Sequence, residues 1–212
     1  MLTTAYTRTT LCLLLSLIGV TGIASANSWD TYTPRQKQQH LVLSAQKQYN
    51  RKHLQSNRRS FRGDCSGFVH TVLWDNGHSL DDFYRAYQYR TNGVDLIHQY
   101  VTRVGWVYKL QQPEKGDLVF FSNTYDKNKD GKHNDLLTHI GIIENIEKDG
   151  TITFLHYIQN KVRRGYMNLQ KPGMHMNNQK TLNSYLRRKT SPTTKTLASQ
   201  LFTEFGHLQP RV

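Results

Sequence analysis

Apolar residues follow a helical period in the first half of the chain. They predict helices over residues 34–49, 65–75, 79–89 and 94–103. The first of these helices has a complete start signal, because Thr33 is a capping residue and Pro34 suits the first helical position. Gln36 then completes a capping box with Thr33.

From residue 104 onward, short apolar runs indicate strands over residues 118–121, 138–146, 151–158 and 162–169. An Asp-Gly pair at residues 149–150 separates two of these runs and predicts a β-hairpin. Helices followed by a strand meander predict a single α+β domain over residues 27–188. Residues 189–212 begin as a polar linker, and residues 197–205 predict a short element that packs back.

The first 26 residues have the pattern of a secretory signal peptide. Arg8 is their only charge, residues 11–23 are apolar, and Ala24-Ser25-Ala26 matches the small-x-small cleavage pattern. The apolar run is short for a bilayer span and a polar segment follows it, so a retained anchor is the less favoured alternative. The sequence therefore predicts export, to the periplasm or out of the cell, with no transmembrane anchor after cleavage.

The charge of the chain limits its partners. The formal net charge is +13 at pH 7, and a basic exported protein is attracted to anionic surfaces of the cell envelope, such as cell-wall polymers. Residues 51–62 are basic, but no nucleic-acid recognition motif accompanies them. We therefore expect a monomer that meets an anionic wall, and no nucleic-acid partner.

Cleavage after Ala26 would leave Cys65 as the single thiol, because Cys12 lies in the signal segment. One cysteine cannot form an internal disulfide, and in an exported protein this favours a chemical role for the thiol. The alternative is a small buried apolar residue, which is a common setting for free cysteine.

Cys65 lies at a predicted helix start, in the segment Asp64-Cys65-Ser66-Gly67-Phe68-Val69. Asp64 is a natural N-cap, so the thiol would lie at the positive end of the helix dipole, beside unpaired backbone N–H groups. Both features favour the thiolate, which is the nucleophile, and N–H groups near Cys65 and Ser66 would hold an oxyanion. The segment predicts acyl-transfer chemistry.

Two histidines on the predicted hairpin are candidates for the base that such a thiol needs. His139 begins one strand, and His156 lies near the end of its partner. With a bulge or a longer loop, antiparallel pairing brings the two imidazoles to nearly opposed positions at the same end of the hairpin. The two side chains can then share one face of the sheet.

Four segments in this order resemble the NlpC/P60 cysteine peptidases. They are Asp64-Cys65-Ser66-Gly67-Phe68-Val69, Gly116-Asp117-Leu118-Val119-Phe120-Phe121, His139-Ile140-Gly141-Ile142 and His156. The resemblance implies a papain-like α+β fold, with N-terminal helices packed on an antiparallel strand meander. It also implies an enzyme that cuts stem peptides of peptidoglycan, typically at the D-glutamyl–diamino acid bond. In that family's scheme Cys65 is the nucleophile, His139 the general base and His156 the residue that orients it, and the chemistry requires no cofactor.

The chain departs from that family upstream of the nucleophile and in the length before His139. Many members have a substrate-binding tyrosine before the cysteine, and Tyr49 is its counterpart here. The added length before His139 has acidic and amide residues at positions 1, 3 and 5 and a glycine at position 6, as calcium loops do. The candidate calcium ligands are Asp126, Asn128, Asp130, Lys132, Asn134 and Asp135.

Calcium at this loop would brace the catalytic strand and take no part in the chemistry. Position 12 of such a loop is usually glutamate, but here it is Leu137, so Asp135 would have to substitute for it. The alternative is a polar loop that uses Asp, Asn and Gly for their turn geometry.

Three functions are open at this point. The first is an exported thiol hydrolase that acts on peptidoglycan or muropeptides. The second is an amidase or acyltransferase that acts on another amide or ester. The third is a non-catalytic wall-binding module with an unreactive Cys65, and the intact set of Cys65, His139 and His156 argues against it.

Overall fold

The computed structural model describes residues 31–87, 92–110 and 112–209. The predicted signal peptide, residues 1–26, lies outside the described residues, and so does the end of the helix predicted over residues 79–89. Within the described ranges, no helix has both the length and the apolar character needed to cross a bilayer.

The four predicted helices all form. They are α2 (Pro34–Lys47), α3 (Cys65–Asp75), α4 (Asp81–Tyr87) and α5 (Gly93–Val104). The capping box of α2 is confirmed, because the Gln36 N–H donates to Thr33 Oγ1 and the Thr33 N–H donates to Gln36 Oε1. α5 begins after Asn92, whose side chain accepts from the N–H groups of Val94 and Asp95.

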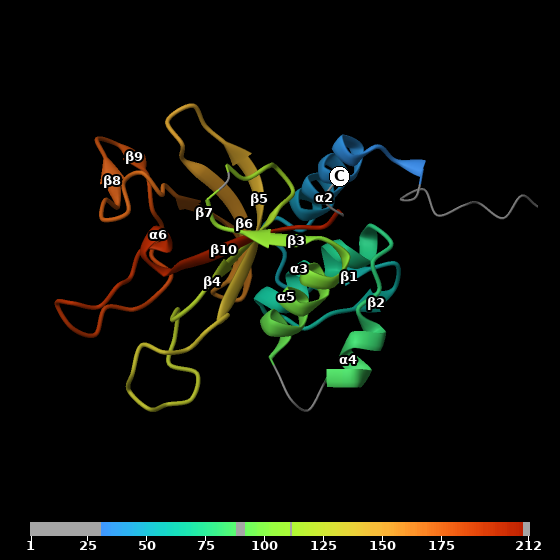
Figure 1. Ribbon diagram of the computed structural model, residues 1–212, viewed down its shortest axis with the longest axis horizontal. Helices are drawn as coiled ribbons and strands as arrows, with labels where there is room; N and C mark the ends of the chain where they lie inside the picture. The colour runs from blue at the N-terminus through green and yellow to red at the C-terminus, as the bar shows by residue number, and fades with distance from the viewer. Residues whose placement is uncertain (1–30, 88–91, 111, 210–212) are drawn as a thin grey trace, which may run out of the picture.

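An antiparallel sheet forms the centre of the molecule (Figure 1). Its six strands, in spatial order, are β3 (Trp106–Tyr108), β10 (Phe202–His207), β4 (Leu118–Phe121), β5 (His139–Ile146), β6 (Ile152–Ile158) and β7 (Lys161–Met167). β4 to β7 are the predicted meander, and β5 and β6 form the predicted hairpin. Outside this sheet lie the pair β1 (Gln55–Ser56) and β2 (Arg59–Ser60), and the pair β8 (Met176–Asn177) and β9 (Lys180–Thr181).

Strand β10 lies between β3 and β4, although it follows every other strand of this sheet in the chain. Phe205 of β10 pairs with Tyr108 on one side and with Val119 on the other. The prediction that residues 197–205 pack back onto the domain is therefore confirmed, with α6 (Ala198–Leu201) leading into β10. The insertion of this strand into the sheet was not predicted.

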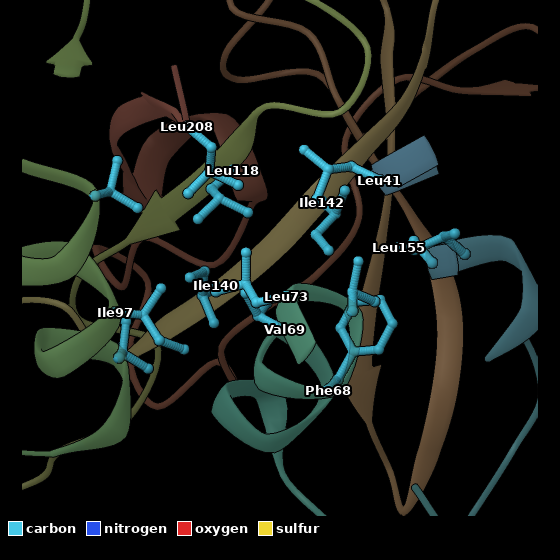
Figure 2. Packing of buried hydrophobic residues seen from close by; sticks show 14 of the residues in the cluster. Leu41, Phe68, Val69, Leu73, Ile97, Leu118, Ile140, Ile142, Leu155 and Leu208 are labelled. Carbon is cyan, nitrogen blue, oxygen red and sulfur yellow. The ribbon is translucent and has the colours of Figure 1, made fainter. Parts of the chain in front are cut away.

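Both faces of the sheet are buried, which explains the unbroken apolar run of β4. Leu118 and Phe120 belong to the hydrophobic cluster that packs against the helices, whereas Val119 and Phe121 belong to the cluster on the other face. Figure 2 shows the first cluster, where side chains of α3 meet those of β5 and β6. This packing fixes α3, and therefore Cys65, against the β5–β6 hairpin.

The fold class is confirmed at the level of a mixed α+β domain with an antiparallel sheet. A papain-like arrangement is compatible with this architecture and stays a prediction.

Candidate active site

Cys65 is the first residue of α3, and Asp64 is its N-cap. Asp64 Oδ1 accepts from the Gly67 N–H at 2.8 Å and from the Ser66 hydroxyl at 2.7 Å. Arg62 lies 2.9 Å from the other carboxylate oxygen of Asp64. The helix start is thus fixed by local contacts around the thiol.

Burial of α3 holds the nucleophile in place from the other side. Residues 66–73 of the helix are all buried, so the first turn cannot shift without disturbing the core. Gly67 is needed here, because a Cβ at this position would lie 1.9 Å from the Arg62 carbonyl oxygen. The glycine that costs helix propensity therefore permits the loop before Cys65 to pass close to the helix.

The two histidines meet at one end of the β5–β6 hairpin. Ile142 pairs with Leu155, and continuing this register places His139 opposite residue 158, two positions beyond His156. Residues two apart on a strand share a face, so both imidazoles lie on the same side of the sheet. His139 Nε2 and His156 Nδ1 are 2.8 Å apart. The predicted bulge is confirmed, and it lies between Ile143 and Asn145.

Cys65 and His139 line the same pocket, which has a volume of about 410 Å³. The backbone N–H of Ile140, the residue after His139, is hydrogen-bonded to the Cys65 sulfur. His156 is 3% exposed and does not line the pocket, so it lies behind His139 as seen from the thiol. The order thiol, first imidazole, second imidazole is the order that nucleophile, base and orienting group require.

Aromatic packing around the pair controls its protonation. The His139 ring lies 6.0 Å from the Phe121 ring, and the His156 ring lies 4.9 Å from the Phe154 ring. Burial lowers the pKa of His139 to about 4. Burial also lowers the pKa of His156 well below its usual value, with further lowering from His139 and Arg163. Both imidazoles are therefore neutral near pH 7.

A neutral pair shares one N–H along the bond between the rings. If His139 Nε2–H donates to His156 Nδ1, then His139 Nδ1 carries a lone pair and can accept a proton. This is the tautomer that a base acting on Cys65 needs.

The pKa of Cys65 is raised to about 12, chiefly by burial and secondarily by the charge of Asp64. The N–H groups of Ile140, Ser66 and Cys65 act in the opposite direction but do not outweigh burial. The raised pKa runs against the expectation that the helix start makes Cys65 a thiolate. The resting state is a neutral thiol beside a neutral imidazole, and the proton moves only when the thiol attacks.

Of the two residues predicted to contact the oxyanion or the substrate, Ser66 lines the pocket and Tyr49 does not. Ser66 lines the pocket, and its N–H lies near the sulfur. Tyr49 does not line this pocket; its ring lies under the Arg164 guanidinium at 4.4 Å and is 45% exposed.

The predicted calcium loop is built from turns. Asp126 Oδ2 accepts from the Gly131 N–H at 2.9 Å, and Asp130 Oδ1 accepts from the Lys132 N–H at 2.8 Å. Asn128 accepts from the Asp130 N–H, and Asn134 donates to the other oxygen of Asp130.

The arrangement of the loop does not by itself make a metal site. Asp135 is buried apart from the exposed loop residues, and its N–H donates to Asn123. Among the described residues, no group of three or more His, Cys, Asp or Glu side chains is placed to hold a metal ion. Calcium binding stays a prediction.

Several residues of the pocket wall were not predicted from the sequence. Tyr125, Tyr157 and Asn160 come from loops or strand ends that are distant from Cys65 in the chain. Gly93 also lines the pocket, and a Cβ there would lie 2.3 Å from Ser66 Oγ. The Asn-Gly pair at 92–93 was a visible turn signal, but nothing in the sequence placed it beside the nucleophile.

Comparison with known proteins finds one family match, and it covers part of the chain. Residues 55–158 match the CHAP domain. The match covers just under half of the chain and includes Cys65, His139 and His156. CHAP domains are cysteine- and histidine-dependent amidohydrolases or peptidases, related to NlpC/P60 but a different family. No curated protein and no solved structure is significantly similar to the chain.

The CHAP match refines the resemblance drawn from the sequence. The predicted class, a cysteine/histidine hydrolase of cell-wall peptides, agrees with it at the coarser level of amidase or peptidase. The family model that matches is CHAP, which is related to the predicted NlpC/P60 family but is not the same family. The shared blocks around Cys65 and His139 did not separate the two families.

Proposed function

We propose that this protein is an exported cysteine hydrolase that cleaves amide bonds in the stem peptides of peptidoglycan. The observation that carries the proposal is the 2.8 Å bond between His139 and His156, behind a pocket that Cys65 and His139 line together. A histidine held by a second buried group beside a thiol is the arrangement of a nucleophile, its base and the group that orients the base.

The first half of the reaction transfers an acyl group to Cys65. The sulfur attacks the amide carbon, and the thiol proton passes to His139 Nδ1. N–H groups of the first turn of α3, near Cys65 and Ser66, stabilise the oxyanion. The C–N bond then breaks, and His139 gives its proton to the leaving amine.

The second half regenerates the enzyme. Water attacks the thioester carbon while His139 accepts a proton from the water. The C–S bond breaks, a carboxylic acid leaves, and the proton returns to the sulfur. His156 keeps His139 in the tautomer that both halves use, and the chemistry requires no cofactor.

The proposed scissile bond and the proposed location rest on the amino-acid sequence. A D-glutamyl–diamino acid bond is the proposed scissile bond, and the periplasm or the cell exterior is the proposed location. The basic composition would keep the enzyme on the anionic wall. The pocket supports a peptide substrate, because its wall mixes charged, amide and aromatic side chains.

Digestion of purified peptidoglycan tests the proposal. We expect the wild-type protein to release fragments that mass spectrometry assigns to one cleaved amide, and Cys65→Ala to release on the order of 10⁴-fold less. Cys65→Ala should keep the melting temperature of the wild type or raise it. Equal cleavage by the variant would contradict the proposal.

An amidase is the second candidate, because CHAP domains include amidohydrolases as well as peptidases. The same digest separates the two. A peptidase leaves part of the stem peptide on the sugar, whereas an amidase that cuts the bond between sugar and peptide releases the whole stem. An acyltransferase would instead transfer the acyl group to an added amine.

A further inference from the structure

A polar groove lies at the end of α3 opposite to the candidate active site. It has a volume of about 500 Å³ and is lined by α2, the segment after α2 and the end of α3. Asp75 lines the groove and Cys65 lines the active-site pocket, ten residues apart on one helix. The two sites are therefore separated by about 15 Å along the helix axis.

Gln48 supplies the observation that points to a ligand. It is the C-cap of α2, it is 3% exposed, and it lines the groove. Its Oε1 atom is buried and has no hydrogen-bond partner among the described residues. A buried amide oxygen without a donor is costly and rare. This oxygen lacks a donor where it lies, and turning of the Gln48 side chain toward the groove would let an O–H or N–H of a ligand satisfy it.

Charge indicates a second property of the ligand. Lys47 and Arg51 are exposed on the wall of the groove, and neither forms an ion pair with a described residue. Among the described residues, Asp75 is the single carboxylate of the lining, and it accepts a hydrogen bond from the Ser56 hydroxyl. Two free cations against one engaged carboxylate favour an anionic ligand.

The far end of the groove is aromatic. The rings of Tyr32 and His40 are stacked, with centroids 4.2 Å apart. A ligand that combines hydroxyl or amide donors, negative charge and ring-shaped units matches all three parts of the lining.

We propose that the groove binds a glycan strand that carries carboxylates, as peptidoglycan does. Sugar hydroxyl or acetamido N–H groups donate to Gln48 Oε1, and the carboxylates pair with Lys47 and Arg51. The inference rests on the proposed function, because it makes the groove a second contact with the polymer that the active site cleaves. Two contacts on one polymer raise affinity without a change at the reacting bond.

Sedimentation with purified, insoluble peptidoglycan tests the groove. All variants carry Cys65→Ala, so that the polymer stays intact. We expect Lys47→Glu/Arg51→Glu to weaken binding about tenfold or more, and Gln48→Leu to weaken it about fivefold. The control is Arg188→Glu/Lys189→Glu, which makes the same charge change at exposed residues outside the groove. It should change binding by less than about twofold.

The outcomes separate the groove from the active site. Groove variants that keep Cys65 should cleave a short soluble stem peptide at the wild-type rate. Equal losses in the groove and control variants would show attraction by net charge alone and overturn the proposal. Unchanged binding by Gln48→Leu would show that water satisfies Oε1, which also overturns it.

Two further results complete the test. Competition by a phosphate-bearing polyol polymer as strong as competition by peptidoglycan would replace the glycan with a general polyanion and overturn the inference. A wild-type protein that binds peptidoglycan through the groove and cleaves nothing would overturn the proposed function and leave the groove standing.

Discussion

A histidine lies close to a polar partner at each end of the sheet, and the two ends differ in what the imidazole meets. At one end His139 meets a second imidazole, and burial leaves both rings neutral. At the other end His207 Nδ1 lies 2.7 Å from Asp117 Oδ1. Burial acts to lower the pKa of His207, but the hydrogen bond and charge of Asp117 outweigh it and raise the pKa.

Asp117 also has more partners than the catalytic pair. Its carboxylate is fully buried and accepts from Gln38, from the Tyr108 hydroxyl and from the Glu114 N–H. A carboxylate with this many donors stabilises the fold, whereas an imidazole with one partner keeps a lone pair for chemistry. The partner of a histidine therefore decides whether the imidazole holds a charge or moves a proton.

Removing one histidine at each end should separate activity from stability. We expect His156→Ala to lower kcat/KM on stem peptides by roughly 100-fold, because His139 loses the partner that orients it. His156→Asn keeps an acceptor and should recover part of this loss. His207→Ala should leave kcat/KM within about twofold and lower the melting temperature. A full loss of activity in His207→Ala would contradict the assignment of His207 to stability alone.

Asp117→Ala should lower stability, as His207→Ala does. Its removal leaves His207 and the other donors of this cluster buried without their acceptor, so the free energy of unfolding should fall by about 3–5 kcal/mol. Urea denaturation measures this change. Asp82→Ala is the matched control, because its carboxylate is exposed and pairs with the exposed Arg85; it should change stability by less than about 0.5 kcal/mol.

The two clusters should also respond to pH in opposite directions. His207 has a raised pKa, so its contribution to stability is complete below the usual histidine pKa of 6.5 and is lost as the pH rises through its folded value. His139 has a lowered pKa, so its contribution is complete above pH 6.5 and is lost as the pH falls toward about 4.

Enzyme kinetics give the second readout of this difference. Since His139 must be neutral to accept a proton, the acid limb of kcat/KM should lie near pH 4, well below 6.5. An acid limb near pH 6.5 would contradict the buried environment of His139. His207→Ala should not move this limb.

The smallest expected effect is that of calcium on the loop before β5. If Asp126, Asn128 and Asp130 bind calcium, 1 mM calcium should raise the melting temperature by about 2–4 °C without a change in kcat/KM. Asp130→Ala should abolish the shift. No shift in the wild type would leave the loop as a set of turns held by its own hydrogen bonds.

Local signals were enough to predict the elements that carry the candidate active site. The N-cap Asp64 placed Cys65 at a helix start, and the Asp-Gly turn brought His139 and His156 together, because both features depend on neighbouring residues. The position of β10 could not be predicted in this way, since strand order depends on pairings across the whole chain. The contact between Asp117 and His207, ninety residues apart, was missed for the same reason.

The protonation of Cys65 shows the limit of local reasoning more sharply. The helix dipole could be inferred from Asp64 and the following turn, and it favours the thiolate. Burial favours the thiol, and it depends on how the helix packs against the sheet, which no local pattern reveals. Burial has the larger effect on the pKa of Cys65, and burial is the effect that the sequence could not predict.

The late position of β10 in the chain has a consequence for synthesis. Residues 202–207 separate β3 from β4, so β3 has no strand neighbour in the sheet, and β4 has only β5, until these residues have left the ribosome. The sheet therefore stays incomplete until β10 has been made. Packing of the hydrophobic cluster around Phe205 follows that step. A chain whose sheet is completed this late stays unfolded for longer during synthesis than a chain whose strands pair in the order in which they are made.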